Sequence, residues 1–335
     1  MRRPYLPALL FPFLVMANAH AADDPARQCQ ADLDDIAAFM PDNDSGGKDL
    51  LADHGAAIET AFRKAKNDAA SVDAAACDAI LRTYLRAWRP GHLSVRQAVP
   101  GAGVAGGTAQ PGKPGEDPLA PQLKLLSKDT LLLVLPTFFD RYQASVEKLV
   151  AERRADLLSH KNWIIDVRAN GGGSDGTYEP FMGFLLDAEL PHNGVEYLVT
   201  PANIKAQEEI CALTSDPKEC EKEMGPVVKA MRAAPAGSFV LKGEQRWSLE
   251  KVEKPEPVKP ARVAILIDRK CGSSCEQFVL EARTSPRVKV LGRPTYGSID
   301  YSNMRGHPLP SGRVLYYSTT RSTRMPDMRI DGIGI

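Results

Sequence analysis

The stretch that decides the fold is VAILIDRKCGSSCEQFVL, residues 263–280. Its first six residues, VAILID, carry a continuous run of five apolar side chains that ends before Asp268, which is typical of a strand buried in a sheet. A helix is predicted to start near Glu276 and to end before Pro286. Ser273 and Ser274 therefore lie in a short turn between strand and helix. Backbone N–H groups are free at such a turn, and the helix dipole favours negative charge there.

Two interpretations of this turn compete. A nucleophilic serine at this place would gain an oxyanion donor from the N–H of the next residue. Alternatively, the serines only cap the helix, because serine is a favoured N-cap residue. Taken alone, the turn favours capping, so the remainder of the chain has to decide between the two.

The sequence on either side of this stretch also alternates between predicted strands and predicted helices. LLLVL (131–135) and WIIDV (163–167) are predicted to be buried strands, with an amphipathic helix from Arg141 to Leu158 between them. The pattern predicts an α/β domain with a largely covered sheet. Further elements are expected as a helix at 178–186 and as strands at 195–199, 288–292 and 314–320.

The chain divides into four predicted parts. Residues 1–21 are predicted to be a signal peptide, and residues 22–95 an N-terminal helical region with three amphipathic segments. Residues 96–122 are rich in Gly and Pro and read as a flexible loop. Residues 123–335 form the core, with an insertion at about 194–259 that contains a charged helical piece.

Export is predicted from the first residues. A basic segment, a short apolar segment and the small-x-small site Ala19-His20-Ala21 predict cleavage after Ala21 and a periplasmic or secreted protein. No later stretch has the length of a membrane-spanning helix. The formal net charge is zero and no block of like charges occurs, so nucleic-acid binding is not indicated.

Six cysteines agree with export, since disulfides form in oxidising compartments. Fifteen connectivities are open, and proximity in the sequence favours the pairs 29–77, 211–220 and 271–275. A zinc site is the rival interpretation. The cysteines do not form two close pairs at ligand spacing and the histidines are scattered, so neither a metal nor another cofactor is predicted.

Two further segments carry candidate chemistry. Residues 170–173, Asn-Gly-Gly-Gly, follow a buried strand and could serve as an oxyanion hole, a phosphate cradle or an ordinary turn. The Walker lysine and the dinucleotide glycine spacing are both absent. His92, at a turn between a helix and a short strand, is a candidate general base, and His307 is its rival.

The order of these pieces is more specific than any one of them. His92, the strand at 131–135, Asp166-Val167-Arg168-Ala169-Asn170-Gly171-Gly172-Gly173 and the block from Ser273 to Gly297 follow one another along the chain. This order resembles the catalytic core of the C-terminal-processing (tail-specific) serine proteases and of the tricorn-core peptidases. The resemblance implies an α/β fold, a crotonase-like ββα-spiral (ClpP/crotonase-type) protease core with an N-terminal helical subdomain, and a polypeptide substrate.

The resemblance also implies roles for residues. Ser273, three residues before Glu276, would be the nucleophile. The N–H groups of Ser274 and Gly172 would form the oxyanion hole, with Gly171 a near rival of Gly172. Glu276 lies in the first helical turn, where a structural role is favoured over an acid role.

Several positions depart from the family pattern. Ser298 stands where tail-specific members have a catalytic lysine, and no segment is long enough for a PDZ domain. The tricorn-like branch fits better, with His92 as base and Asp331 as the acidic group that orients it. The family has a serine beside the histidine where this chain has Gly91, so Ser298 is expected to supply that hydroxyl. A non-catalytic ligand- or peptide-binding relative, and an enzyme acting on esters, remain as alternatives.

Overall fold

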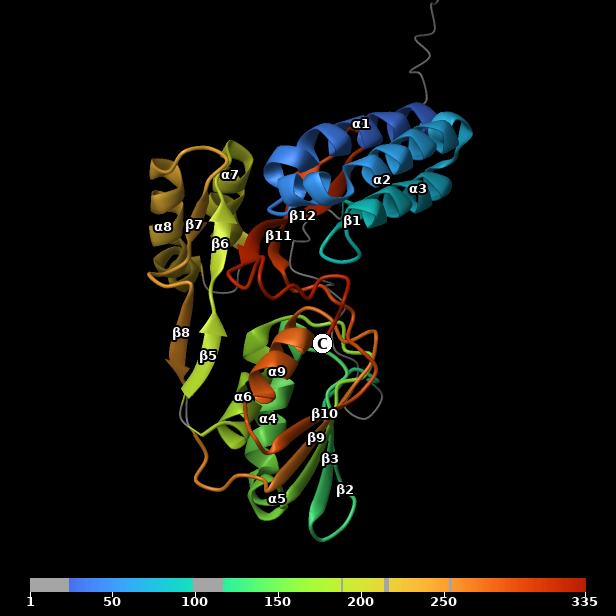
Figure 1. Cartoon of the computed structure of the whole chain (residues 1–335). Coiled ribbons are helices and arrows are strands. Elements are labelled where there is room, and N and C mark those ends of the chain that lie inside the picture. Colours follow the sequence, from blue (N-terminus) through green and yellow to red (C-terminus); the bar gives the residue numbers. More distant parts are fainter. Residues whose placement is uncertain (1–23, 99–116, 188, 214–216, 253–254) are drawn as a thin grey trace, which may run out of the picture.

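The computed structural model describes residues 24–98, 117–187, 189–213, 217–252 and 255–335. The predicted signal peptide and most of the predicted Gly/Pro-rich loop lie outside these residues. Two bodies are stacked one above the other, each built around a sheet of its own (Figure 1). Among the described helices, none is both long and apolar enough to cross a membrane.

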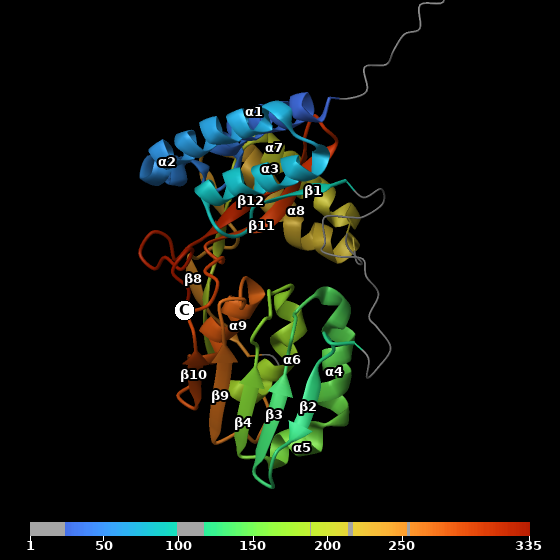
Figure 2. The same cartoon turned by 90° about the vertical axis from the view of Figure 1, so that its right-hand side faces the viewer.

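The lower body is an α/β unit. Its five-stranded sheet has the order β10-β9-β4-β3-β2, and the pairs between β10, β9, β4 and β3 are parallel while β2 is antiparallel (Figure 2). The strands are β2 (Gln122–Leu125), β3 (Thr130–Val134), β4 (Asn162–Asp166), β9 (Arg262–Ile267) and β10 (Val288–Gly292). The helices are α4 (Gln143–Glu152), α5 (Arg154–Ser159), α6 (Asp175–Leu185) and α9 (Ser274–Ala282), with the 3-10 turn η2 (Asp140–Tyr142) before α4.

The lower sheet is covered by helices on one face, so the prediction of a largely covered sheet is wrong. Helices α4, α6 and α9 lie on the same side of the strands (Figures 1 and 2). Burial alternates along β3, where Leu131 and Leu133 are buried and Leu132 is only half-buried. The continuous apolar sequence of such a strand therefore places one row of side chains on the buried face of the sheet and the other row on its half-buried face.

The predicted helix at 141–158 is interrupted. Arg153 leaves helical geometry, with φ −107° and ψ 15°, and separates α4 from α5. Its guanidinium bonds to the Asp156 carboxylate at 2.6 Å and to the carbonyl oxygen of Leu123 at 3.5 Å. These contacts tie the break to the edge strand β2.

The upper body combines the two ends of the chain. Helices α1 (Pro25–Asn43), α2 (Gly47–Asp68) and α3 (Ala74–Trp88) confirm the three predicted amphipathic segments, with η1 (Ala69–Ser71) after α2. The Asp24 and Asp73 side chains cap α1 and α3 by accepting backbone N–H bonds at 3.0 and 2.7 Å. The apolar faces of these helices share one core with Leu315 and Tyr317 from the end of the chain.

The upper sheet has the order β1-β12-β6-β7, and β11 also pairs with β12. Its strands are β1 (Ser94–Gln97), β6 (Val195–Leu198), β7 (Phe239–Leu241), β11 (Tyr301–Pro308) and β12 (Arg313–Ser322). Two of them, β6 and β7, belong to the predicted insertion, which therefore completes a sheet and is not merely a surface excursion.

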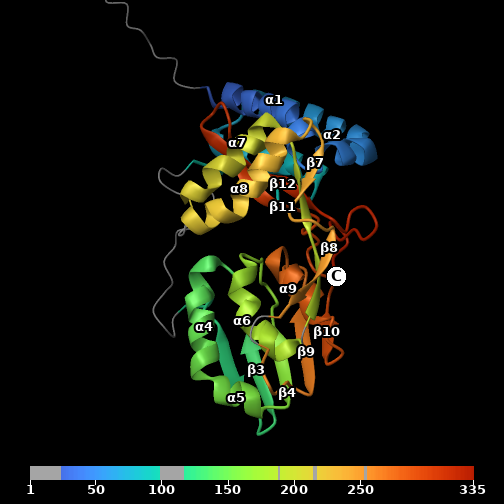
Figure 3. The ribbon, with the colours of Figure 1, turned by 90° about the vertical axis from the view of Figure 1, so that its left-hand side faces the viewer.

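The segments that lead into and out of the insertion join the two bodies. Strand β5 (Glu189–Asn193), just before the insertion, and strand β8 (Trp247–Lys251), within it, form a two-stranded ribbon that runs between them (Figures 1 and 3). Helices α7 (Pro201–Ile210) and α8 (Pro217–Ala233), with η3 (Cys211–Leu213) between them, pack beside β6 and β7.

The cysteine pairing favoured by sequence proximity is confirmed. The disulfides are Cys29–Cys77, Cys211–Cys220 and Cys271–Cys275. The first ties α1 to α3, the second ties η3 to α8, and the third closes the turn before α9. Each bridge therefore fixes one local junction within one body.

Candidate active site

Ser273 occupies a sharp turn between β9 and α9. Its φ of 57° and ψ of −126° lie in a region that a residue with a side chain rarely adopts. The Cys271–Cys275 disulfide spans the turn, and the Cys275 N–H donates to the carbonyl oxygen of Gly272 at 3.1 Å. Strain of this kind is typical of a nucleophile elbow, in which the backbone presents a serine hydroxyl to a cavity.

Glu276 holds this turn against the segment that follows β10. Its buried carboxyl group accepts the N–H of Ser273 at 3.1 Å, Gly297 at 2.7 Å and Ser298 at 2.8 Å. It also accepts the Thr295 hydroxyl at 2.6 Å. Both carboxyl oxygens are engaged in these bonds, so the side chain has the structural role that its position in the first turn favours.

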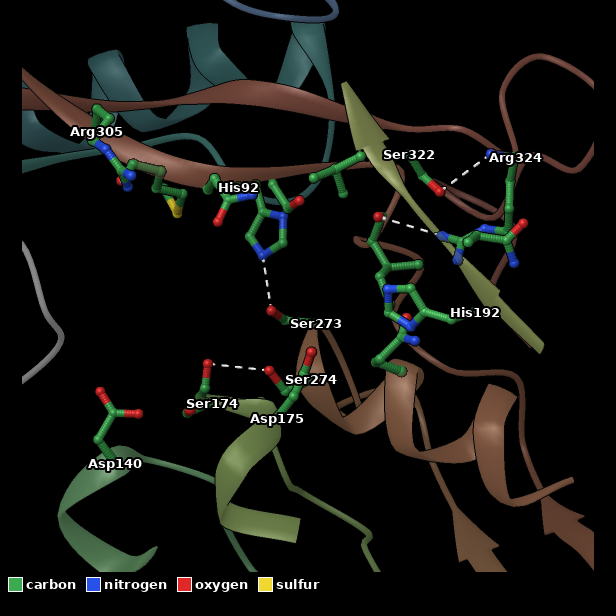
Figure 4. A pocket seen from close by; sticks show the side chains of 18 of the residues that line it. His92, Asp140, Ser174, Asp175, His192, Ser273, Ser274, Arg305, Ser322 and Arg324 are labelled. Atoms are coloured by element: carbon green, nitrogen blue, oxygen red, sulfur yellow. Dashed lines mark hydrogen bonds between the residues drawn. The ribbon is translucent and has the colours of Figure 1, made fainter. Parts of the chain in front are cut away.

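His92 meets Ser273 from the upper body. Its Nε2 atom lies 3.0 Å from the Ser273 Oγ atom, and its Nδ1 atom makes a short contact with the carbonyl oxygen of Tyr301 (Figure 4). A carbonyl oxygen can only accept, so Nδ1 carries the proton and Nε2 is the free base. Burial lowers the pKa of His92, the Tyr301 carbonyl raises it, and the Arg89 charge lowers it. The net shift of the pKa is downward, which favours the neutral imidazole that a general base requires.

A buried ion pair fixes the loop that carries His92. Arg89 binds both carboxylate oxygens of Asp44, at 2.5 and 2.7 Å. The same guanidinium donates to the carbonyl oxygens of Gly91 at 3.0 Å and of His92 at 3.2 Å. Since a bidentate pair has a defined geometry, it sets the path of residues 89–92. His92 itself has a φ of 53°, so this path is a strained one.

Asp331, the expected orienting group of His92, makes no hydrogen bond to it in the described structure. Its Oδ1 atom accepts the N–H groups of Ile299 at 2.6 Å and Asp300 at 2.8 Å, and no hydrogen bond links the carboxyl group to the imidazole. These two residues directly precede Tyr301, whose carbonyl contacts His92. Burial raises the pKa of Asp331 to about 7, and its Oδ2 atom is buried with no partner in the described structure.

Ser298 lies against the His92 loop without bonding to the imidazole. A Cβ atom placed on Gly91 would be 2.2 Å from the Ser298 Cβ, so the two backbones approach closely. The buried Ser298 donates its N–H to Glu276, and no hydrogen bond joins its hydroxyl to His92. This packing explains why a glycine stands at position 91.

The glycine turn after β4 lies directly beside the serine turn. A Cβ atom on Gly172 would be 2.6 Å from the carbonyl oxygen of Gly272 and 2.8 Å from the Ser273 Cβ. However, the Gly172 N–H donates to the Asn170 side chain at 2.9 Å, so it is already occupied. Gly171 has no atom near such a Cβ. Gly172 is thus a close-packing residue.

Gly173 is the neighbour with a free donor. It lines the cavity together with Ser274, and the N–H groups of both residues have no partner in the described part of the chain. The Ser274 hydroxyl donates to the carbonyl oxygen of Gly173 at 3.1 Å, which joins the two segments. The arrangement offers two backbone donors beside Ser273.

These groups line a cavity of about 590 Å³ between the two bodies. Ser273, Ser274 and Asp175 lie on one side of it, and His92 and Arg305 lie on the other (Figure 4). Within the described residues, no group of acidic, histidine or cysteine side chains is placed to hold a metal ion.

The rival histidine lies elsewhere. His307 donates from Nε2 to the Asp35 carboxylate at 2.7 Å and stacks on the Phe39 ring, with centroids 3.8 Å apart. Sequence reasoning missed the Tyr301 carbonyl, the Gly173 N–H and the Arg89–Asp44 pair. Backbone N–H and carbonyl groups occur in almost every residue, so the residue types do not indicate which of them take part in a site. Only Arg89, three residues before His92, could have been suspected from its position.

Comparisons with known proteins agree on one family. The model for peptidase family S41 matches residues 129–335, and no curated protein matches the chain. Mature CPAF is similar in structure, with a TM-score of 0.60, 12% sequence identity and coverage of 93% of this chain and 92% of that one. CPAF complexed with lactacystin has a TM-score of 0.59 and 12% sequence identity, and the match covers 93% of this chain and 93% of that one. A candidate peptidase of Parabacteroides merdae has a TM-score of 0.52 and 15% sequence identity, and the match covers 92% of this chain and 88% of that one. At these identities the structural likeness shows a shared α/β fold.

Proposed function

The chain belongs to peptidase family S41 and is a serine-type peptidase, and we propose that it is an exported endopeptidase with Ser273 as nucleophile and His92 as general base. The observation that carries the proposal is the 3.0 Å separation of Ser273 Oγ and His92 Nε2. A non-catalytic binding relative would not require this contact. The strained turn at Ser273 and the lowered pKa of His92 give further support.

The first step is acyl transfer. His92 Nε2 takes the hydroxyl proton as Ser273 Oγ attacks the carbonyl carbon of a peptide bond. The Tyr301 carbonyl accepts the Nδ1–H of the imidazole and stabilises its charged form, a role that a carboxylate has in many serine peptidases. The imidazolium then protonates the leaving amine, and a water activated by the same nitrogen releases the acyl group.

The oxyanion of the tetrahedral intermediate is held by backbone donors. The N–H of Ser274 is retained as one donor, as predicted from the sequence. The N–H of Gly173 replaces that of Gly172 as the other donor, because the Gly172 N–H is bonded to the Asn170 side chain. Losing one such donor typically costs about 10²–10³ in rate. Asp331 and Ser298 act as positioning residues, through the segment that leads to Tyr301 and through packing on Gly91.

A crotonase-like ββα spiral is the architecture proposed for the lower body. Its parallel strands β3, β4 and β9 are each followed by a helix on the same face of the sheet. Export to the periplasm or outside the cell is proposed from the three disulfides and from the predicted signal peptide.

The test uses peptides blocked at both ends, with products identified by mass spectrometry. The wild-type protein is expected to cut internal bonds, and Ser273→Ala to cut none. Products formed only by trimming from an end would contradict an endopeptidase. Equal cleavage by Ser273→Ala would contradict the assigned nucleophile.

A further inference from the structure

Arg305 stands out among the arginines that line or adjoin the cavity. It lies on β11, on the same side of the cavity as His92 (Figure 4). Among the described residues its guanidinium donates to two neutral acceptors, the Met304 carbonyl at 2.9 Å and the Gln207 side-chain oxygen at 2.5 Å. Its Nε atom is buried without a partner in the described structure.

The three buried arginines in the described part of the chain are each paired with a carboxylate, whereas Arg305 is half-buried. Arg89 pairs with Asp44, Arg313 with Asp32 and Asp78, and Arg324 with Asp300. Within the described residues no ion pair is found for Arg305. A partly desolvated cation without a counter-charge is unfavourable, and a bound anion would relieve that cost. Burial lowers the pKa of Arg305, in agreement with a missing counter-charge.

The charges of the cavity are separated. Asp140 and Asp175 lie on the side of Ser273, opposite Arg305 (Figure 4). Arg324, whose Nε atom is also buried without a partner, lies on the side of His92. The wall of the cavity also includes the apolar side chains of Met304 and Ile299. An anionic group would therefore bind on the upper wall of the cavity.

We propose that Arg305 binds a carboxylate group of the polypeptide substrate and makes the enzyme selective for peptides that place this group in the cavity of Ser273. The inference rests on the proposed function, because it assigns a substrate class to the same cavity. A guanidinium matches a carboxylate with two parallel N–H bonds, and a neutral amide, which has a single oxygen, cannot accept both in this way. The carboxylate can come from a Glu or Asp side chain or from the end of the peptide.

The test compares peptides that differ only in this charge. Blocked peptides carry Glu or Gln at each position around the cleaved bond, and a second set has a free or amidated C-terminus. For wild type we expect kcat/KM to be about ten- to hundredfold higher for the charged member of one pair. The set that shows the preference identifies the source of the carboxylate. In Arg305→Gln the ratio should fall to near one, and in Arg305→Lys it should be intermediate.

Arg283→Gln is the matched control, because Arg283 is exposed and does not line the cavity. It should keep the wild-type ratio. Labelling of Ser273 by a fluorophosphonate gives an independent reading, since a charged peptide should slow labelling of wild type more than its neutral partner does. If wild type is labelled at Ser273 but cleaves charged and neutral peptides equally well, and both protect it equally from labelling, the inference is overturned while the proposed function stands. Wild type that is not labelled and cleaves nothing overturns the proposed function itself.

Discussion

His92 Nε2 and Ser273 Oγ lie 3.0 Å apart although 181 residues separate them in the chain. One residue comes from the upper body and the other from the lower body, so the catalytic pair exists only when the two bodies are stacked (Figure 1). Each residue has a strained backbone, held by a buried polar group: Arg89 for the first and Glu276 for the second.

Replacement of His92 by Ala should lower kcat/KM by about 10²–10⁴, because the general base is removed. His307→Ala is the control. That histidine pairs with Asp35 away from the cavity and should leave kcat/KM within a few-fold of wild type. Steady-state hydrolysis of a blocked peptide measures both. Equal losses in the two variants would mean that His92 has no special role.

Gly172→Ala should impair catalysis while Gly171→Ala does not. Gly172 has a φ of +91°, and a Cβ atom there would press on the Ser273 Cβ and on the Ser274 nitrogen. The backbone strain costs about 1–2 kcal/mol, and a displacement of about 1 Å at the nucleophile reduces the rate by about 10². At Gly171 the added Cβ meets open space. If the Gly171 variant loses as much kcat as the Gly172 variant, close packing beside Ser273 is not the reason.

The Cys271–Cys275 bridge should matter for rate more than for stability. Replacing both cysteines by Ala is expected to reduce the free energy of unfolding by about 2 kcal/mol, because the closed loop is short. We expect kcat to fall at least tenfold, since the turn that presents Ser273 loosens. The Cys211–Cys220 pair closes a longer loop, worth about 3 kcal/mol, away from Ser273. The double Ala variant of this pair should lose at least as much stability and keep its kcat. If kcat falls in proportion to stability in both double variants, the Cys271–Cys275 bridge does not position Ser273.

Asp331→Asn should change how stability depends on pH. Burial raises the pKa of Asp331 to about 7 in the folded protein, against about 4 in the unfolded chain. The folded state then binds the proton more tightly, so this group's contribution to stability decreases as the pH rises from about 4 to about 7. Asparagine keeps an oxygen for the N–H groups of Ile299 and Asp300 and does not titrate.

The measurement is urea unfolding of wild type and of Asp331→Asn between pH 4 and pH 8. The difference in unfolding free energy should move in favour of the variant as the pH rises. Parallel curves would show that Asp331 does not titrate in this range. Because the carboxyl group acts through the backbone before Tyr301, kcat/KM at pH 8 should fall by less than about tenfold, well short of the effect of removing His92.

Local patterns predicted much of this molecule, and contacts between distant segments account for what they missed. The apolar run before Ser273 and the helix after it were enough to predict the turn that carries the serine. The partner of Ser273 came from the order of motifs, because no local property distinguishes His92 from His307. The Tyr301 carbonyl was beyond prediction, since every residue has one.

The sheets show the same division. Apolar runs predicted the strands at 131–135, 163–167 and 263–268, but not that the helices cover one face of their sheet. The pairing of Val195 with Ser322 joins the predicted insertion to the last strand. The alternation of residue types along a strand decides which face it buries. The choice of a partner strand this far away in the sequence depends on the tertiary fold.

The central claim is that Ser273, activated by His92, is the nucleophile of this peptidase. Reaction with a fluorophosphonate, followed by mass spectrometry of the digested protein, locates the modified residue directly. The account predicts one label on Ser273 in wild type, none in Ser273→Ala and strongly slowed labelling in His92→Ala. A label on another residue, or undiminished labelling of Ser273→Ala, would contradict it.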